Sequence, residues 1–147
     1  MGRVVVYIGS DHRGFLLKSA IKEHLAGRGC KTLDMGPLGY DKDDDFIDYA
    51  GAVCKETLKG RGRGILVCGS GHGMCIAANK IKGIRAALCW NEKSGRWARE
   101  HQDANVLCLA GQISSVSEAK GAVDAWLDSR FSGEERHARR ISRLNEM

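Results

Sequence analysis

Short runs of β-branched and other apolar residues alternate along the chain with segments in which apolar residues recur every three or four positions. The first pattern is typical of strands in a buried sheet, and the second of amphipathic helices. Strands are predicted at 4–8, 31–35, 64–67, 84–88 and 106–109. Helices are predicted at 15–28, from 46 onward, at 74–81, at 92–100, around 119–127 and over about 133–147.

The helix that begins at Phe46 shows both a start signal and an apolar face. A run of acidic residues precedes Phe46, and negative charge stabilises the N-terminus of a helix. Its predicted apolar face consists of Ile47, Ala50, Val53, Cys54 and Leu58.

Strands that alternate with helices predict βαβ units, right-handed crossovers and a parallel sheet. The sequence therefore predicts an α/β fold, a three-layer α/β/α sandwich, in a single domain over residues 1–147. Ligands of such sheets bind outside the carboxyl ends of the strands. We expect GSDHRG, CGSGHG and the segment around His101 to meet at that edge.

Composition excludes several classes of protein. Of the 147 residues 43% are hydrophobic and 28% charged, and no apolar run approaches the roughly 20 residues of a membrane span. The start of the chain lacks a signal-peptide pattern, so a cytoplasmic protein without membrane contact is expected.

The six cysteines form no C-x-x-C pair, which argues against a disulfide scaffold and a zinc site. A net charge of +5 suits an anionic small molecule at least as well as nucleic acid, and a small-molecule ligand without a nucleic-acid partner is expected.

The segment CGSGHG holds the most informative pattern. Cys68 ends an apolar strand, and Gly69, Gly71 and Gly73 follow on alternate positions. Glycines let backbone N–H groups approach an anion closely. The spacing matches neither a P-loop, nor a dinucleotide fingerprint, nor a hydrolase elbow. The segment is therefore either an oxyanion or phosphate cradle with a sulfur beside it, or only a tight turn after a buried strand.

These residue types suit the transfer of a proton on a carbon acid. A Cys68 thiolate can act as the base, since a helix N-terminus and nearby imidazoles lower the pKa of a thiol. The amides of residues 69–73 would stabilise the oxyanion that forms beside the carbonyl, and His101 could move protons on oxygen. Together they indicate an enediolate isomerase. The alternative is that Asp11 and His12 form a helix cap with a solvated imidazole, and that His101 is an ordinary surface or core residue.

The last predicted helix carries rows of arginine. Arg136 and Arg140 lie four positions apart and so project from one helix face, as paired cationic donors to a phosphate would. Arg139 and Arg143 form a second row. The alternative is a solvated helix face on which Glu135 pairs with Arg139.

Five segments of the chain resemble type B ribose-5-phosphate isomerases, the family that includes allose-6-phosphate isomerases and the subunits of galactose-6-phosphate isomerase. They are GSDHRGF at 9–15, CGSGHGMCIAANK at 68–80, GIRAALC at 83–89, REHQDANVL at 99–107 and FSGEERHARRI at 131–141. The resemblance implies a Rossmann-like fold with a five-stranded parallel sheet. It implies a homodimer or a dimer of dimers with active sites shared between subunits, and neither a metal nor an organic cofactor.

The resemblance also implies roles for individual residues. Cys68 would move the proton between C1 and C2; some members use instead a glutamate, at the position of Met74. Ser70 would assist at the substrate hydroxyls, and His101 would open the sugar ring, across the dimer interface. The remaining contacts to substrate would come from Asp11 at the hydroxyls, from His12, Arg136 and Arg140 at the phosphate, and from Gly69, Gly71, His72 and Gly73 in the loop.

Three substrate-facing positions depart from the usual pattern of that family. Phe46 replaces a tyrosine, Gln102 replaces an asparagine, and Gln112 replaces an arginine that would bind phosphate. The chemistry is expected to be isomerisation of ribose 5-phosphate and ribulose 5-phosphate. Because the three changes line one expected pocket, they indicate a shift in substrate more than neutral drift. The alternative substrates are four-carbon erythrose or erythrulose 4-phosphate, or a branched or six-carbon sugar phosphate. A phosphosugar-binding subunit without catalysis is a further alternative.

Overall fold

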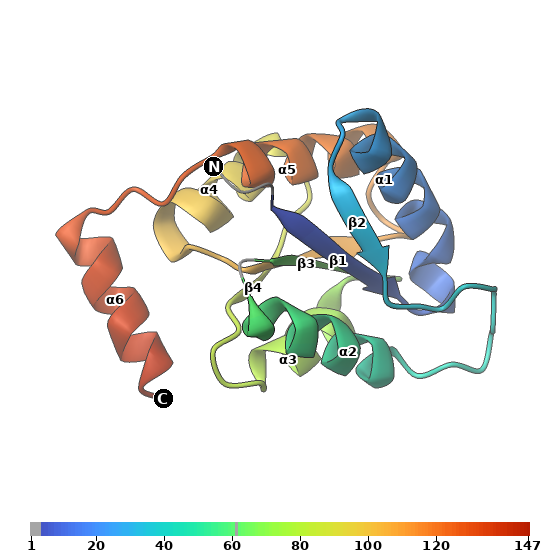
Figure 1. The fold of residues 1–147 in the computed structure, drawn as a ribbon, viewed down its shortest axis with the longest axis horizontal. Coiled ribbons are helices and arrows are strands. Elements are labelled where there is room, and N and C mark those ends of the chain that lie inside the picture. Colours follow the sequence, from blue (N-terminus) through green and yellow to red (C-terminus); the bar gives the residue numbers. More distant parts are fainter. Residues whose placement is uncertain (1–3, 61) are drawn as a thin grey trace.

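The fold is a parallel five-stranded sheet between two layers of helices, as seen in a computed structural model that describes residues 4–60 and 62–147 (Figure 1). The strand order is β2-β1-β3-β5-β4, and each neighbouring pair is parallel. The strands are β1 (Val5–Ser10), β2 (Lys31–Asp34), β3 (Arg63–Cys68), β4 (Ala86–Leu88) and β5 (Val106–Ala110). The predicted α/β/α sandwich is thereby confirmed.

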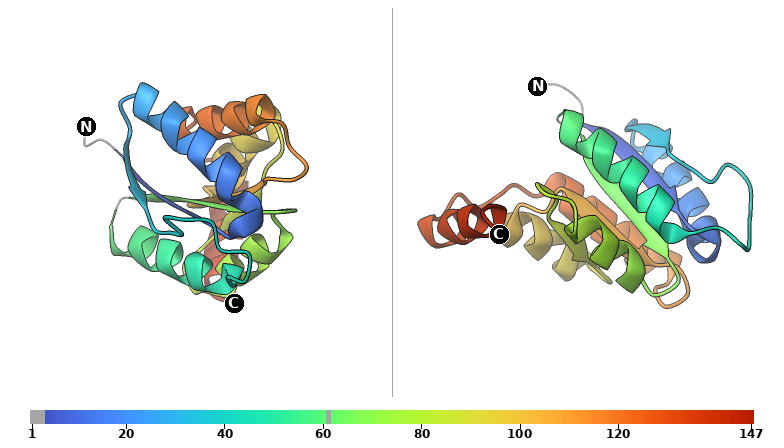
Figure 2. Two further views of the ribbon diagram at one scale, coloured as in Figure 1. Left: turned by 90° about the vertical axis from the view of Figure 1, so that its right-hand side faces the viewer. Right: turned by 90° about the horizontal axis from the view of Figure 1, so that it is seen from below.

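The helices divide between the two faces of the sheet. Helices α1 (Phe15–Gly27), α4 (Glu92–Gln102) and α5 (Val116–Asp128) cover one face, and α2 (Phe46–Lys59) and α3 (His72–Asn79) cover the other (Figures 1 and 2). A short 3₁₀ turn, η1 (His12–Gly14), precedes α1. No helix of the described ranges is both long and apolar enough to cross a membrane.

Each face of the sheet has its own apolar core. Ile65 and Leu107 pack under the layer of α1, α4 and α5, where the fully buried Trp126 lies. Leu66 and Cys108 point to the opposite face, toward α2 and α3. Strands buried on both faces need apolar residues at successive positions, which explains the unbroken apolar runs in the sequence.

The predicted apolar face of α2 is partly wrong. Ala50, Val53 and Cys54 are buried, but the side chains of Ile47 and Leu58 are 61% and 44% exposed. Thr57 takes the inward position instead, because it continues the i, i+3, i+4, i+7 row that starts at Ala50. Its hydroxyl can be buried since it donates to the carbonyl of Val53 at 2.8 Å.

The C-terminal helix α6 (Glu135–Asn145) projects from the sandwich beside α4 (Figures 1 and 2). The ring of His137, its buried residue, lies 4.8 Å from the ring of His101 in α4. Arg85 Nη1 donates to Asn145 Oδ1 at 3.2 Å. The helix is therefore attached at two points while most of its side chains face solvent.

Substituting Gly14 with alanine is expected to destabilise the fold. A Cβ on Gly14 would lie 2.3 Å from the carbonyl oxygen of Val67, and this backbone atom cannot move without shifting β3. We expect a loss of about 1–3 kcal/mol in the free energy of unfolding, measured by urea unfolding at one protein concentration. The control is Gly27→Ala at the end of α1, where nothing lies within 4 Å of the added carbon. Equal stability of the two variants would contradict this account of the packing.

Candidate active site

The glycine loop joins β3 directly to α3. Cys68 ends the strand with 5% of its surface exposed, and α3 begins at His72, two residues before the predicted start. Gly71 has a φ of +78°, and a Cβ there would lie 2.4 Å from Leu88 Cδ1. A side chain at Gly71 would therefore be excluded by both backbone conformation and space. Ser70 Oγ accepts a hydrogen bond from the backbone N–H of His72 at 3.4 Å.

Backbone hydrogen bonds tie this loop to the segments that follow the neighbouring strands. The N–H groups of Gly111 and Gln112 donate to the carbonyls of Cys68 and Gly69 at 2.8 and 2.9 Å. On the other side, the N–H of Asp11 donates to the carbonyl of Val67 at 3.2 Å. The loops after β1, β3 and β5 therefore form one connected surface at the carboxyl edge of the sheet.

The segment after β1 presents an oriented imidazole. Asp11 is 7% exposed, and its carboxylate accepts from the N–H of Gly14 at 3.0 Å. His12 Nδ1 lies 2.9 Å from Asp44 Oδ1, and the His12 backbone N–H donates to the same oxygen at 3.1 Å. Helix α2 begins at Phe46, directly after the run of acids, as predicted, although Asp45 makes no side-chain capping bond. Asp44 orients His12, a partner that the sequence pattern did not indicate.

An open cavity of about 630 Å³ lies beside the glycine loop. It is lined by His12, Arg13, Phe15, Leu16, Tyr40, Gly111 and Gln112. A Cβ on Gly69 would lie 2.9 Å from Gln112 Oε1, and one on Gly73 would lie 2.9 Å from the ring of Phe46. The structure thus brings Cys68, Ser70 and the glycine loop together with Asp11, His12, Phe46 and Gln112.

The predicted meeting of His101 with these loops is wrong within one chain. His101 lies in the last turn of α4, which leads to the start of β5 at Val106. In a parallel sheet the amino ends of all strands lie at one edge, so His101 and Gln102 are near the edge opposite Cys68. A helix that connects two parallel strands must run back across the sheet, and this return places its C-terminus at that edge.

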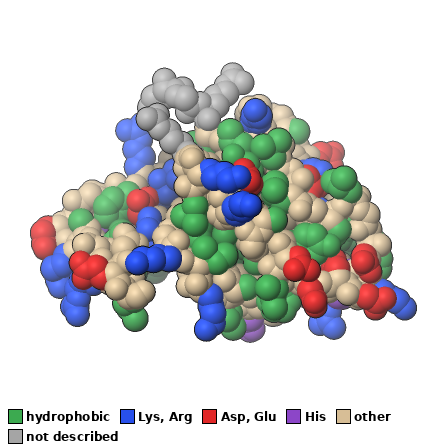
Figure 3. All heavy atoms as spheres, turned by 60° about the horizontal axis from the view of Figure 1, so that its bottom comes forward, with side chains coloured by type: hydrophobic (Ala, Val, Ile, Leu, Met, Phe, Trp, Pro, Cys, Tyr) green, Lys and Arg blue, Asp and Glu red, His purple; other side chains and the backbone are tan. Residues whose placement is uncertain are grey.

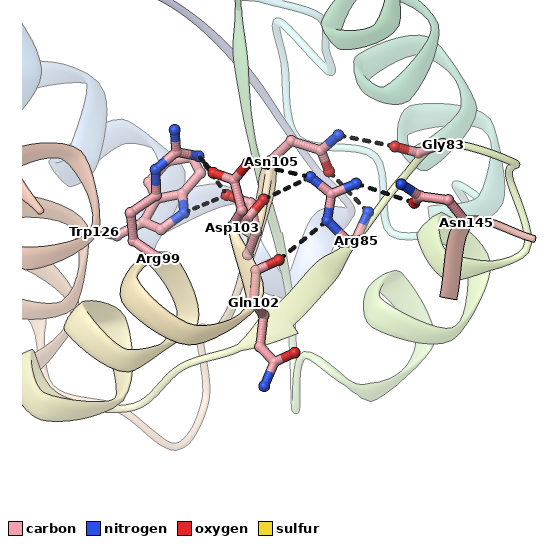
Figure 4. Close-up of polar contacts among 9 residues, drawn as sticks. Gly83, Arg85, Arg99, Gln102, Asp103, Asn105, Trp126 and Asn145 are labelled. Atoms are coloured by element: carbon pink, nitrogen blue, oxygen red, sulfur yellow. Dashed lines mark hydrogen bonds and ion pairs between the residues drawn. The ribbon is translucent and has the colours of Figure 1, made fainter. Parts of the chain in front are cut away.

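A network of polar contacts holds the end of α4 in place (Figure 4). Arg99 Nη1 lies 2.9 Å from Asp103 Oδ1, and Arg85 Nε donates to the backbone carbonyl of Gln102 at 3.0 Å. Asn105 Nδ2 donates to the carbonyl of Gly83 at 2.9 Å. The amide side chain of Gln102 points away from this network (Figure 4).

His101 borders a second cavity, of about 390 Å³, along α4. The ring of Trp97 stacks on that of His101 with 5.7 Å between ring centroids, and Trp90 lines the same cavity. Trp90 and Trp97 are 57% and 47% exposed.

The arginines of α6 also lie on the side of the molecule that holds His101. Arg136 Nε pairs with Glu134 at 2.9 Å, and Arg139 Nε lies 3.7 Å from Glu135, as the alternative for this helix anticipated. Arg140 is exposed. None of these side chains lines the cavity beside the glycine loop of the same chain.

Comparison with known proteins gives a consistent answer over nearly the whole chain. Residues 6–144 match the model of the Ribose/Galactose Isomerase family. Ribose-5-phosphate isomerase B of Mycobacterium tuberculosis is 42% identical over 99% of this chain and 91% of the relative, and that of Escherichia coli is 39% identical over 95% and 93%.

Solved structures agree with this result. Ribose-5-phosphate isomerase B of Mycoplasma genitalium, with bound ribulose-5-phosphate, superimposes with a TM-score of 0.93 at 41% identity, covering 97% of this chain and 95% of the other. The isomerase of Thermotoga maritima gives 0.94 at 41% identity, covering 99% and 100%. The protein thus belongs to the ribose/galactose isomerase family.

Proposed function

We propose that this protein interconverts ribose 5-phosphate and ribulose 5-phosphate, with Cys68 as the base. Relatives about 40% identical are named for this activity, and a similar structure contains ribulose-5-phosphate. The observation that carries the role of Cys68 is its place at the end of β3, directly before a glycine loop and the start of α3. A thiol there adjoins free backbone N–H groups, which favour negative charge.

The reaction requires a proton to move from C2 to C1 of the open-chain sugar. The Cys68 thiolate takes the proton from C2, and the electron pair of the C–H bond forms the C1–C2 double bond of the enediolate. The charge that develops on O1 is stabilised by N–H groups of the glycine loop. The proton then returns from the thiol to C1, while a hydroxyl proton passes from O2 to O1, with Ser70 assisting at the hydroxyls.

The complete site requires a second copy of the chain. His101 would open the sugar ring, and Arg136 and Arg140 would hold the phosphate together with His12. Within one chain, however, α4 and α6 keep His101, Arg136 and Arg140 out of the cavity that His12 lines. In a homodimer, or a dimer of dimers, the α4–α6 side of one subunit would face the glycine loop of the other.

Exposed apolar side chains are consistent with such an assembly. Trp90 and Trp97 border His101, and Ile76 on α3 is 63% exposed. Apolar side chains are spread over the face formed by α2 and α3, beside the projecting α6 (Figure 3).

Removing the thiol of Cys68 is expected to abolish turnover while leaving binding intact. We expect kcat of Cys68→Ala to fall at least roughly 10³-fold, because the base is lost, with the affinity for ribose 5-phosphate retained in calorimetry. The control is Cys54→Ala, a buried thiol on α2 whose pKa burial raises to about 11. Near-full activity of Cys68→Ala would rule out Cys68 as the base.

Alkylation offers an independent measurement of the same thiol. Iodoacetamide should inactivate the enzyme, and substrate should protect it. A hydrogen bond with Cys108 lowers the pKa of the partly buried Cys75 thiol to about 7, so Cys75 is expected to react as well. The experiment therefore uses the Cys75→Ala background, with the site of modification identified by mass spectrometry.

Mixing two inactive variants tests the shared site. Cys68→Ala and His101→Ala homodimers should each be nearly inactive. After re-association, about a quarter of wild-type activity should return, because half of randomly paired dimers are mixed and each contains one intact site. Subunit exchange is verified by native mass spectrometry. Absence of recovery despite exchange would place both residues in the site of one chain.

Phe46, Gln102 and Gln112 alter the expected wall of the sugar pocket, so other sugar phosphates are tested beside ribose 5-phosphate. Four-carbon, branched or six-carbon sugar phosphates would be the alternatives. We expect kcat/KM to be highest for ribose 5-phosphate in a panel of four-, five- and six-carbon aldose phosphates. Turnover of each sugar is measured as the rate at which its ketose forms. A higher value for another sugar would reassign the substrate, and no turnover with any would indicate a binding subunit without catalysis.

A further inference from the structure

The cavity beside the glycine loop has one permanent cation. Its lining contains Arg13 and His12, while Tyr40, Gly111 and Gln112 are uncharged. A sugar phosphate brings about two negative charges, which require charged hydrogen-bond donors as well as backbone N–H groups. Arginine matches a phosphate especially well, since its planar guanidinium can donate two parallel hydrogen bonds.

Contacts along its stem hold Arg13 against the loop that follows Cys68. A Cβ on Gly69 would lie 3.1 Å from Arg13 Cδ and 3.4 Å from Arg13 Cβ, so the side chain of Arg13 packs over that glycine. A Cβ on Gly111 would lie 2.8 Å from the Arg13 carbonyl oxygen. The absence of a side chain at Gly69 and Gly111 therefore allows Arg13 to pack against the backbone of both loops. The side chain of Gln112 also lies against Gly69.

The two carboxylates that flank His12 make their hydrogen bonds to other groups than Arg13. Asp11 accepts from the N–H of Gly14 and Asp44 Oδ1 pairs with His12, while Asp44 Oδ2 is buried without a hydrogen-bond partner. The ion pairs found in residues 4–60 and 62–147 include no partner for Arg13, which is exposed. A cation that is packed along its stem and has no carboxylate partner is available to an anionic ligand.

We propose that Arg13 is the cation that the chain carrying the glycine loop itself supplies to the substrate phosphate, beside Arg136 and Arg140 of a second copy and in place of the charge that Gln112 lacks. The inference rests on the proposed sugar-phosphate isomerase activity and names a further residue of that site. Gln112, on the same glycine, contributes a neutral amide. The phosphate subsite then keeps a charged donor, and Gln112 alone does not imply a different substrate.

The test measures phosphate binding and catalysis separately. For Arg13→Ala, we expect the KM for ribose 5-phosphate and the dissociation constant of inorganic phosphate, measured by calorimetry, each to rise roughly tenfold or more. kcat should change only a few-fold, because Arg13 does not act on C1 or C2. Lys31→Ala, which removes the same charge at the start of β2, is the control and should leave both constants unchanged. Arg13→Lys should retain most of the affinity.

Moving the charge completes the test. Adding Gln112→Arg to Arg13→Ala should restore both constants to within a few-fold of wild type, since both side chains border Gly69. Unchanged phosphate affinity in Arg13→Ala, or no recovery in the double variant, would overturn the proposal. The phosphate measurement does not require turnover, so it remains informative even if the wild-type protein isomerises none of the sugars tested.

Discussion

The hydrogen bonds that continue past the carboxyl ends of the three central strands are the constraint on which the site depends. Two hydrogen bonds extend the ladder between the strands by a further step. On one side the Asp11 N–H donates to the Val67 carbonyl, and on the other the Gly111 N–H donates to the Cys68 carbonyl. Because β3 is central, its last two residues are held from opposite sides, Val67 by the segment after β1 and Cys68 by the segment after β5. Cys68 is thereby placed in a rigid frame, and the glycine loop starts from a defined direction.

A second set of polar contacts supports the wall of the cavity. Lys18, 1% exposed, donates from Nζ to Asp34 Oδ1 at 2.9 Å and to the Pro37 carbonyl at 2.5 Å. Burial alone would raise the pKa of Asp34, but hydrogen bonds from Lys22 and Lys18 lower it. These contacts tie α1 to the start of the loop that carries Tyr40 and Asp44. The buried Lys18 therefore helps to position the loop whose Asp44 orients His12.

The direction of the chain explains why a single chain holds only part of the proposed site. Each helix that connects parallel strands ends at the amino edge of the sheet, and α4 carries His101 to that edge. The network around Arg85 and Asp103 then secures it there (Figure 4). If the proposed site is correct, it can form only when two chains associate, because its parts lie near opposite edges of the sheet.

The sequence by itself determined the parallel α/β/α fold and the loop at residues 68–73, because apolar periodicity and glycine spacing act locally along the chain. The resemblance to an isomerase family added roles for Cys68, His101 and the arginines of α6. Only the tertiary structure decided that Asp44 orients His12, that Arg13 packs on Gly69, and that His101 lies away from Cys68. These contacts join segments far apart in sequence, and no local pattern records which side chains the packing of strands and helices brings together.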